Sequence, residues 1–272
     1  MILENRTFSF VQMQVATTEV CDGANYPVVA GTDINFQFVV EAEDSTELSF
    51  LLSSHPVRLV LYDGSILQAT QAWIYKDLGA NRVLISLPAG NSVVDSLADN
   101  TCFRFRYITD GADITQGYDS TCFIKKASAK DTTLLKYSSP TDQNGFIYCD
   151  APAGFENSIR LPMIISDVSF EGTDNIYRFS NGRQYNAAGF RNKVLHFKTD
   201  LLEISALDYL TAALMSRSVT VENEKYAGEI VPTGAIEADF DEDNIAIKDY
   251  PTATFTAYQT PYDVALNPCI NC

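Results

Sequence analysis

Apolar and polar residues alternate in short runs along most of the chain, and glycine, proline, asparagine or aspartate separates one run from the next. Alternation with a period of two predicts β-strands that bury one face. The strands predicted in the first half are 7–15, 35–41, 47–53, 57–62, 65–75, 82–87, 101–107 and 120–125. Those predicted in the second half are 158–168, 175–179, 193–198, 218–222, 225–231 and 253–258.

Short turn sequences predict how some of these strands connect. Asp63-Gly64 lies between two β-rich runs, which is typical of a tight hairpin. Asn223-Glu224 separates two further strands and predicts a second hairpin. Residues 180–183 and 186–189 contain asparagine and glycine, and we expect both to be turns.

The run 101–107 alternates between aromatic and charged residues. Phe103 and Phe105 fall on one face of the predicted strand, whereas Arg104 and Arg106 fall on the other. This pattern predicts a sheet with one buried face and one face toward solvent.

One segment has a helical period instead. From about 203 to 216 the apolar residues form a single stripe, which predicts a helix that packs on a sheet. The residues of this stripe are Ile204, Leu207, Leu210, Ala213 and Leu214. A shorter helix of one or two turns is expected at 92–97.

The 272 residues are enough for two domains with separate cores. The boundary should fall within 126–158, where the chain turns polar and contains proline and Asn-Gly. We expect an N-terminal β domain, 1–126, which could contact other subunits or act as an adaptor. The C-terminal β domain, 127–272, would contain the helix at about 203–216 and an extended tail. Both domains are predicted to be β-sandwich-like.

Charge and composition exclude several classes of partner. The formal net charge is −16, whereas proteins that bind nucleic acid or anionic membranes present clustered lysine and arginine. We therefore expect no nucleic-acid or membrane partner. The sequence contains no apolar run of roughly 18 residues, and its first residues lack the pattern of a signal peptide. We expect synthesis in a cytoplasm, where the six cysteines would stay reduced.

The sequence carries no recognisable catalytic motif. Its two histidines are His55, in a predicted turn, and His196, in a predicted strand where a half-exposed structural role is the better interpretation. A Gly-x-Ser-x-Gly turn, a glycine-rich phosphate loop and a His-Glu-x-x-His helix are all missing. We expect no enzyme activity, no catalytic residues and no cofactor.

The acidic run that begins at Asp239 resembles the start of a calcium loop. Carboxylates stand at Asp239, Asp241 and Asp243, but Asn244 and Tyr250 occupy the positions that require glycine and glutamate. A solvated acidic loop is the better interpretation, and no metal site is expected here.

Two further patterns leave alternatives open. Cys269 and Cys272 have the spacing of a zinc or redox pair, but a zinc site would need distant partners such as Cys102 and Cys122. A Cys102–Cys122 disulfide is a minor alternative. Trp73, on a predicted strand, gives slender support to a carbohydrate-binding module.

Several segments resemble a family of uncharacterised tail and baseplate proteins from phages and prophages of gut Bacteroidetes, including crAss-like phages. These segments are 133–148, 159–163, 175–183, 195–200 and 209–226. The likeness covers roughly residues 100–260 and leaves the first 95 residues unassigned.

This resemblance implies a structural protein of a virion tail, baseplate or connector ring, with no catalysis. Its partners would be other copies in a homo-oligomeric ring and neighbouring tail proteins. Residues 109–118 and 230–272 are our candidates for arms that reach adjacent subunits. A host-surface or carbohydrate-binding module at a tail tip is the alternative.

Overall fold

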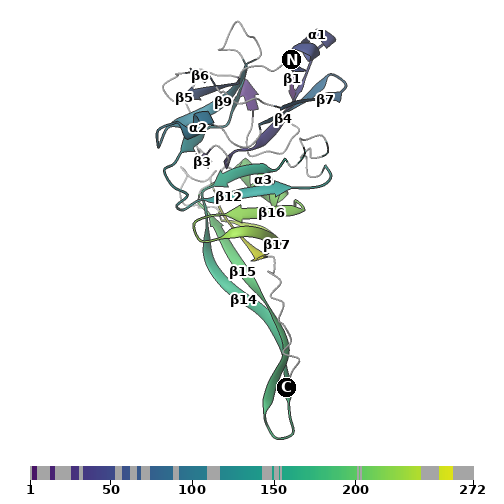
Figure 1. The fold of residues 1–272 in the computed structure, drawn as a ribbon, viewed down its shortest axis with the longest axis vertical. Helices are drawn as coiled ribbons and strands as arrows, with labels where there is room; N and C mark the ends of the chain where they lie inside the picture. The colour runs from purple at the N-terminus through teal and green to yellow at the C-terminus, as the bar shows by residue number, and fades with distance from the viewer. Residues whose placement is uncertain are drawn as a thin grey trace.

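The computed structural model shows a mainly β fold that is elongated along one axis (Figure 1), which confirms the predicted fold class. The structure describes residues 2–4, 13–15, 26–30, 33–52, 57–61, 66–68, 74–87, 92–108, 117–142, 149, 153, 155–200, 202, 204–239 and 251–259. Within these ranges the strands form three sheets.

The first half of the chain supplies two of the sheets. In the described residues, the smaller sheet has the strand order β1-β4-β8-β7, formed by Ile2–Glu4, Phe36–Glu41, Arg82–Leu87 and Ile74–Gly79. The larger has the order β2-β10-β9-β11-β3, formed by Met13–Val15, Gly117–Ser120, Cys102–Ile108, Phe123–Lys125 and Tyr26–Val28. Strand β5 (Val57–Leu61) pairs with β9 and also with β6 (Ile66–Gln68). The predicted chain reversal is therefore confirmed, although Asp63-Gly64 itself lies outside the described residues.

Aromatic side chains join these two sheets face to face. The ring of Phe36 on β4 lies 5.8 Å from that of Phe105 on β9. Phe38 lies 5.8 Å from Tyr107 in the same way, with its ring nearly perpendicular. All four side chains are buried. Edge-on and tilted pairs of this kind add to the free energy gained by burying large apolar surfaces. The two sheets therefore form a sandwich.

The opposite face of β9 is buried as well, so the prediction of a solvent face for Arg104 and Arg106 is wrong. Arg106 donates two hydrogen bonds to Asp119 of β10, at 2.6 and 2.8 Å. The Nε atom of Arg104 lies 3.1 Å from the same carboxylate. Burial lowers the pKa of Arg104, Asp119 raises it, and Arg106 lowers it further. The ion pairs satisfy charges that would otherwise be costly to bury.

Helix α1 (Ser45–Leu52) replaces the strand predicted at 47–53. Asp44 caps its first turn, because its Oδ1 accepts a hydrogen bond from the Thr46 amide at 2.8 Å and its carbonyl accepts one from Leu48. Such a cap stabilises a helix by about 1 kcal/mol, and residues 45–52 form a helix despite their local alternation. The short helix expected at 92–97 is confirmed as α2 (Ser92–Asp95).

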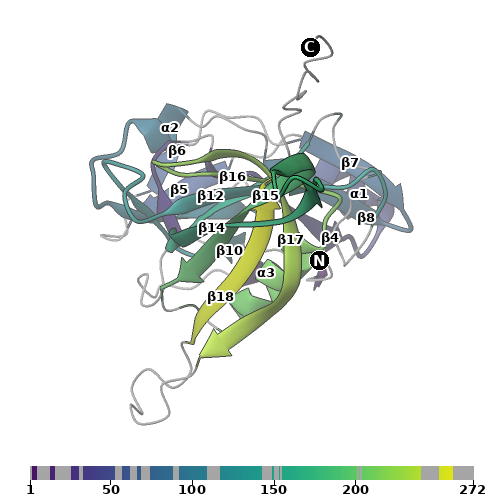
Figure 2. The same ribbon diagram turned by 90° about the horizontal axis from the view of Figure 1, so that it is seen from below.

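The second half forms one sheet with a helix on it. The order is β13-β12-β16-β17-β18-β15-β14, formed by Asn157–Leu161, Thr133–Ser138, Ser218–Glu222, Ala227–Asp239, Thr252–Gln259, Gln184–Thr199 and Met163–Arg178. Helix α3 (Ile204–Leu214) lies against one face (Figure 2) and confirms the helix predicted at about 203–216. Leu210 and Ala213 are fully buried. No helix among the described residues is long and apolar enough to span a membrane.

A proline divides the strand predicted at 158–168. Strand β13 ends at Leu161 and β14 begins at Met163, because Pro162 has no amide hydrogen to donate to a ladder. The Pro162 carbonyl accepts the Asp200 amide at 2.7 Å, and the Thr133 hydroxyl donates to the Met163 carbonyl at 2.6 Å. The two edge strands of the sheet are thus consecutive in the chain and meet at one corner.

A buried ion pair connects the two halves of the molecule. Asp33 precedes β4, and Arg160 of β13 donates to its carboxylate at 2.6 and 3.2 Å. Both side chains are 5% exposed. Asn35 and Ser158 also exchange backbone hydrogen bonds across the junction, at 3.2 and 2.9 Å. One hydrophobic core continues through both halves, so the division into 1–126 and 127–272 stays a prediction.

We expect Asp33→Ala to lower the free energy of unfolding by about 3–5 kcal/mol, because it leaves the buried Arg160 without its partner. Urea denaturation measures the change. The exposed pair between Lys136 and Glu222, 3.7 Å apart, gives the matched control, since Glu222→Ala should cost no more than about 1 kcal/mol. Equal effects of the two substitutions would contradict a structural role for the buried pair.

Candidate functional site

Strands β14 and β15 form a long hairpin that projects away from the first two sheets (Figure 1). They pair with each other from Met163↔Thr199 to Arg178↔Gln184. Strand β18 pairs with β15 only from Val194 to Lys198. Beyond that point the two strands have no other described strand beside them, and residues 170–193 are called the arm below.

The turn at the end of the arm is the one predicted at 180–183. Phe179 accepts a hydrogen bond from the Gly182 amide and donates its own to the Arg183 carbonyl, both at 2.9 Å. The Asn181 side chain accepts the Arg183 amide at 3.0 Å. Gly182 has φ +80°, a conformation in which other residues are strained. Asn-Gly therefore fixes the reversal.

The turn predicted at 186–189 is wrong, because these residues lie within β15. The ladder shifts register nearby, between Asn175 and Ile176 of β14. A β-bulge of this kind takes up an extra residue without ending the strand. Asparagine, alanine and glycine here mark an irregular strand and not a reversal.

The tip of the arm, residues 178–183, is exposed at every position. Phe179 keeps 58% of its surface exposed, and Arg178 and Arg183 flank it. Neither arginine makes an ion pair with a described residue. In a chain of net charge −16, an exposed aromatic ring between two cations is a local exception. Aromatic and arginine side chains together are typical of the centres of protein interfaces.

Two contacts hold the base of the arm to the body. The Tyr258 hydroxyl on β18 reaches across β15 and donates to Glu171 on β14 at 2.9 Å. The Lys193 ammonium lies 5.7 Å from the centre of the Tyr226 ring. The hydrogen bond to Glu171, the charge of that carboxylate and, least, desolvation raise the pKa of Tyr258.

A groove lies beside the first residues of β14, and we call it the base groove. One part, of about 80 Å³, is lined by Ala129, Asp131, Thr132, Ile164, Ile165, Asn223, Glu224 and Lys225. A second part, of about 330 Å³, shares Ile165 and Lys225 with the first and is also lined by Ser166, Asp167, Val168, Lys193, Leu195 and Tyr226. The larger part reaches the lower end of the about 300–1,000 Å³ usual for small-molecule sites, but both parts are open to solvent and do not enclose a ligand. The base groove is better suited to a protruding side chain.

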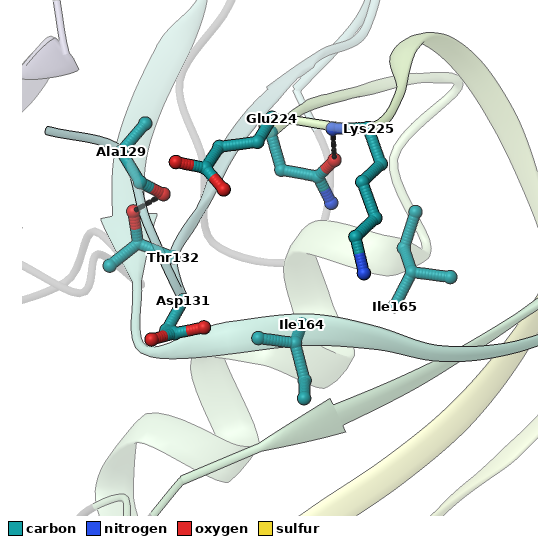
Figure 3. A pocket seen from close by; sticks show the side chains of 8 residues that line it. Ala129, Asp131, Thr132, Ile164, Ile165, Glu224 and Lys225 are labelled. Carbon is teal, nitrogen blue, oxygen red and sulfur yellow. Dashed lines mark hydrogen bonds between the residues drawn. The ribbon is translucent and has the colours of Figure 1, made fainter.

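The walls of the base groove carry opposite charges (Figure 3). The carboxylates of Asp131 and Glu224 stand on one side, and Lys225 stands nearer Ile165 on the other. Ile164 forms part of the floor and is 42% exposed. The Thr132 hydroxyl donates to the Ala129 carbonyl at 2.8 Å and fixes the acidic wall.

The hairpin predicted around Asn223-Glu224 is confirmed and supplies another wall. The Asn223 amide donates to the Tyr226 carbonyl at 2.8 Å. Its side-chain oxygen accepts the Lys225 and Tyr226 amides, each at 2.9 Å. These bonds hold the two charged residues of the turn at the mouth of the groove.

His196 lies on β15, as predicted, and is half-buried. Its Nε2 is 2.9 Å from the Ser169 hydroxyl, and Asp167 stands opposite it in the ladder. Sequence spacing alone could not reveal this trio, because the register of the hairpin brings it together. The Asp167 carboxylate accepts the Val168 amide at 2.7 Å. The Ser169–His196 contact is a cross-strand hydrogen bond that supports the register.

Most of the other sequence candidates lie outside the described residues. Asp239 ends β17, whereas Asp241, Asp243, Trp73 and His55 lie outside the described residues. No group of three histidine, cysteine or acidic residues in the described ranges could hold a metal ion.

One cysteine overturns the expectation of reduced thiols. Cys122 is disulfide-bonded, whereas Cys102 and Cys149 are not. The alternative of a Cys102–Cys122 bond is therefore wrong. The ladder places Ile124, and not Cys122, opposite Cys102. The partner of Cys122 lies outside the described residues, as do Cys269 and Cys272.

The structure corrects one of the two expected arms in part and does not describe most of the other. Residues 230–239 and 252–259 belong to β17 and β18, so the region 230–272 is not one extended tail. Residues 109–116 lie outside the described ranges, and β10 begins at Gly117. Among the described residues, the element that projects is the β14–β15 hairpin, which sequence analysis divided into separate strands.

Comparison with protein-family models finds no family that matches this chain, and comparison with curated proteins finds no match either.

We expect Tyr258 to ionise above the ordinary value of about 10. Because its folded-state pKa is raised, its contribution to stability is present below pH 10 and is lost as the pH rises through the folded-state pKa. The difference between the alkaline absorbance titrations of the wild type and Tyr258→Phe isolates this phenol. Glu171→Gln should lower the midpoint, and a wild-type midpoint at or below 10 would refute the contact.

Alkylation of the denatured, unreduced chain should label Cys102 and Cys149 but leave Cys122 unlabelled. Adding a reductant before alkylation should then expose Cys122. Peptide mass spectrometry distinguishes the three sites. Labelling of Cys122 without reductant would show that the disulfide does not form.

Proposed function

We propose that the chain is a structural component of a phage tail, baseplate or connector ring, which acts through contacts between subunits and not through catalysis. The observation that carries this proposal is the arm. Within residues 170–193 the two strands of the hairpin pair with each other and with no other described strand. Phe170 and Phe179 remain 66% and 58% exposed on it. Exposed large apolar side chains on a projecting element favour a protein partner.

Two further features support a role in a particle. The resemblance described above links residues 100–260 to tail and baseplate proteins. The disulfide at Cys122 is typical of proteins that persist in oxidising surroundings, which include virion surfaces. The alternative of a carbohydrate-binding module depends on Trp73, which lies outside the described residues.

Light scattering of the purified chain over a range of concentrations tests the proposal, and negative-stain imaging shows the form of any multimer. We expect rings or higher multimers. A variant in which Asn-Gly replaces residues 173–190 keeps the Gly172↔Arg191 pair as the end of a shorter hairpin. It should remain folded by circular dichroism and lose most of its association. A wild type that stays monomeric at every concentration would overturn the proposal.

A further inference from the structure

We propose that the tip of the arm of one copy binds the base groove of a second copy. This contact rests on the proposed assembly function and specifies its partner. The occupant of the groove is thus the segment Arg178–Arg183 of another molecule of the same chain.

The apolar parts of the two surfaces match. Phe179 is 58% exposed at the tip, and Ile164 is 42% exposed on the groove floor. In a single copy, the apolar surfaces of both side chains are therefore partly exposed to water. Placing the ring on Ile164 and Ile165 removes both surfaces from water.

The charged parts match as well. Arg178 and Arg183 flank the ring at the tip, and Asp131 and Glu224 stand together on one wall of the groove (Figure 3). Arginine forms strong, often bidentate, hydrogen bonds with carboxylates. Lys225 occupies the other wall, and the larger part of the groove adds Lys193 and Asp167. The proposed orientation therefore places the arginines toward Asp131 and Glu224 and away from the two lysines.

The overall charge of the chain favours a second copy as the partner of the basic tip. The chain carries 35 acidic and 19 basic residues, so another copy offers a mainly acidic surface to a basic tip. An anionic polymer would also attract the two arginines, but it would leave Phe179 and Ile164 uncovered. A second copy satisfies both the charge and the apolar match.

Geometry makes this contact head-to-tail. Ile164 and Phe179 lie at opposite ends of β14 and its turn, and a strand rises about 3.3 Å per residue, so they are about 50 Å apart. The base grooves of successive copies should therefore lie about 50 Å apart. Such a contact closes into a ring if the rotation between copies permits it and otherwise continues as a filament.

Charge reversal tests the contact. We expect the tip variant R178E/R183E and the groove variant D131K/E224K each to weaken association at least tenfold in sedimentation velocity. Mixing the two variants should restore association, because each reversed surface then meets its complement. The control K76E/R217E changes the net charge as much as the tip variant does, at exposed positions outside both surfaces, and should assemble like the wild type.

The outcomes distinguish a wrong contact from a wrong assembly function. If the wild type assembles and either variant assembles equally well, or if the mixture recovers nothing, this contact is wrong while the assembly function stands. A wild type that never assembles overturns both proposals. Circular dichroism of each variant establishes that it is folded, which is expected because all four side chains are exposed.

Discussion

The ion pair between Asp33 and Arg160 links the sandwich to the sheet that bears the arm. The Asp33 carboxylate also accepts the Val29 amide at 2.8 Å, so the loop before β4 is held by the same group. Arg160 in turn donates to the Thr132 hydroxyl at 3.2 Å, which is bonded to Ala129 in the wall of the base groove. One buried pair therefore orients the two halves and supports the acidic wall. Its charges are tolerable in the core only because they satisfy each other.

A short series of contacts connects this junction to the base of the arm and fixes the direction in which the arm projects. Strand β13 carries Arg160 and ends at Pro162, where the backbone turns into β14. Hydrogen bonds from Thr133 and Asp200 fix that corner. The first part of the hairpin is then fastened by β18 and by the Tyr258–Glu171 bond. Two strands alone are only marginally stable in water, so rigidity at the base determines where the tip can reach.

The spacing of apolar residues predicted most strands and the helix α3, because burial of one face leaves a local pattern with the period of each element. It failed where a distant residue decides the outcome. Arg104 and Arg106 looked solvent-facing, but Asp119 returns on β10 and pairs with both. The arm was missed for a related reason, since an irregular strand around 186–189 has the composition of a turn. The base groove could not be predicted at all, because the loop at 129–132, the start of β14 and the turn at Asn223-Glu224 meet only in the fold.

The acidity of the chain bears directly on how an arm could work between copies. Two bodies of charge −16 repel each other, and at low salt this repulsion acts over tens of ångströms. At about 0.1 M salt the Debye length is only about 10 Å, so repulsion between bodies separated by an arm's length is largely screened. Contacts between arginine and carboxylate act at hydrogen-bond distance and are screened less. A long arm with a basic, aromatic tip therefore separates the long-range repulsion from the short-range attraction, and moderate salt favours the attraction.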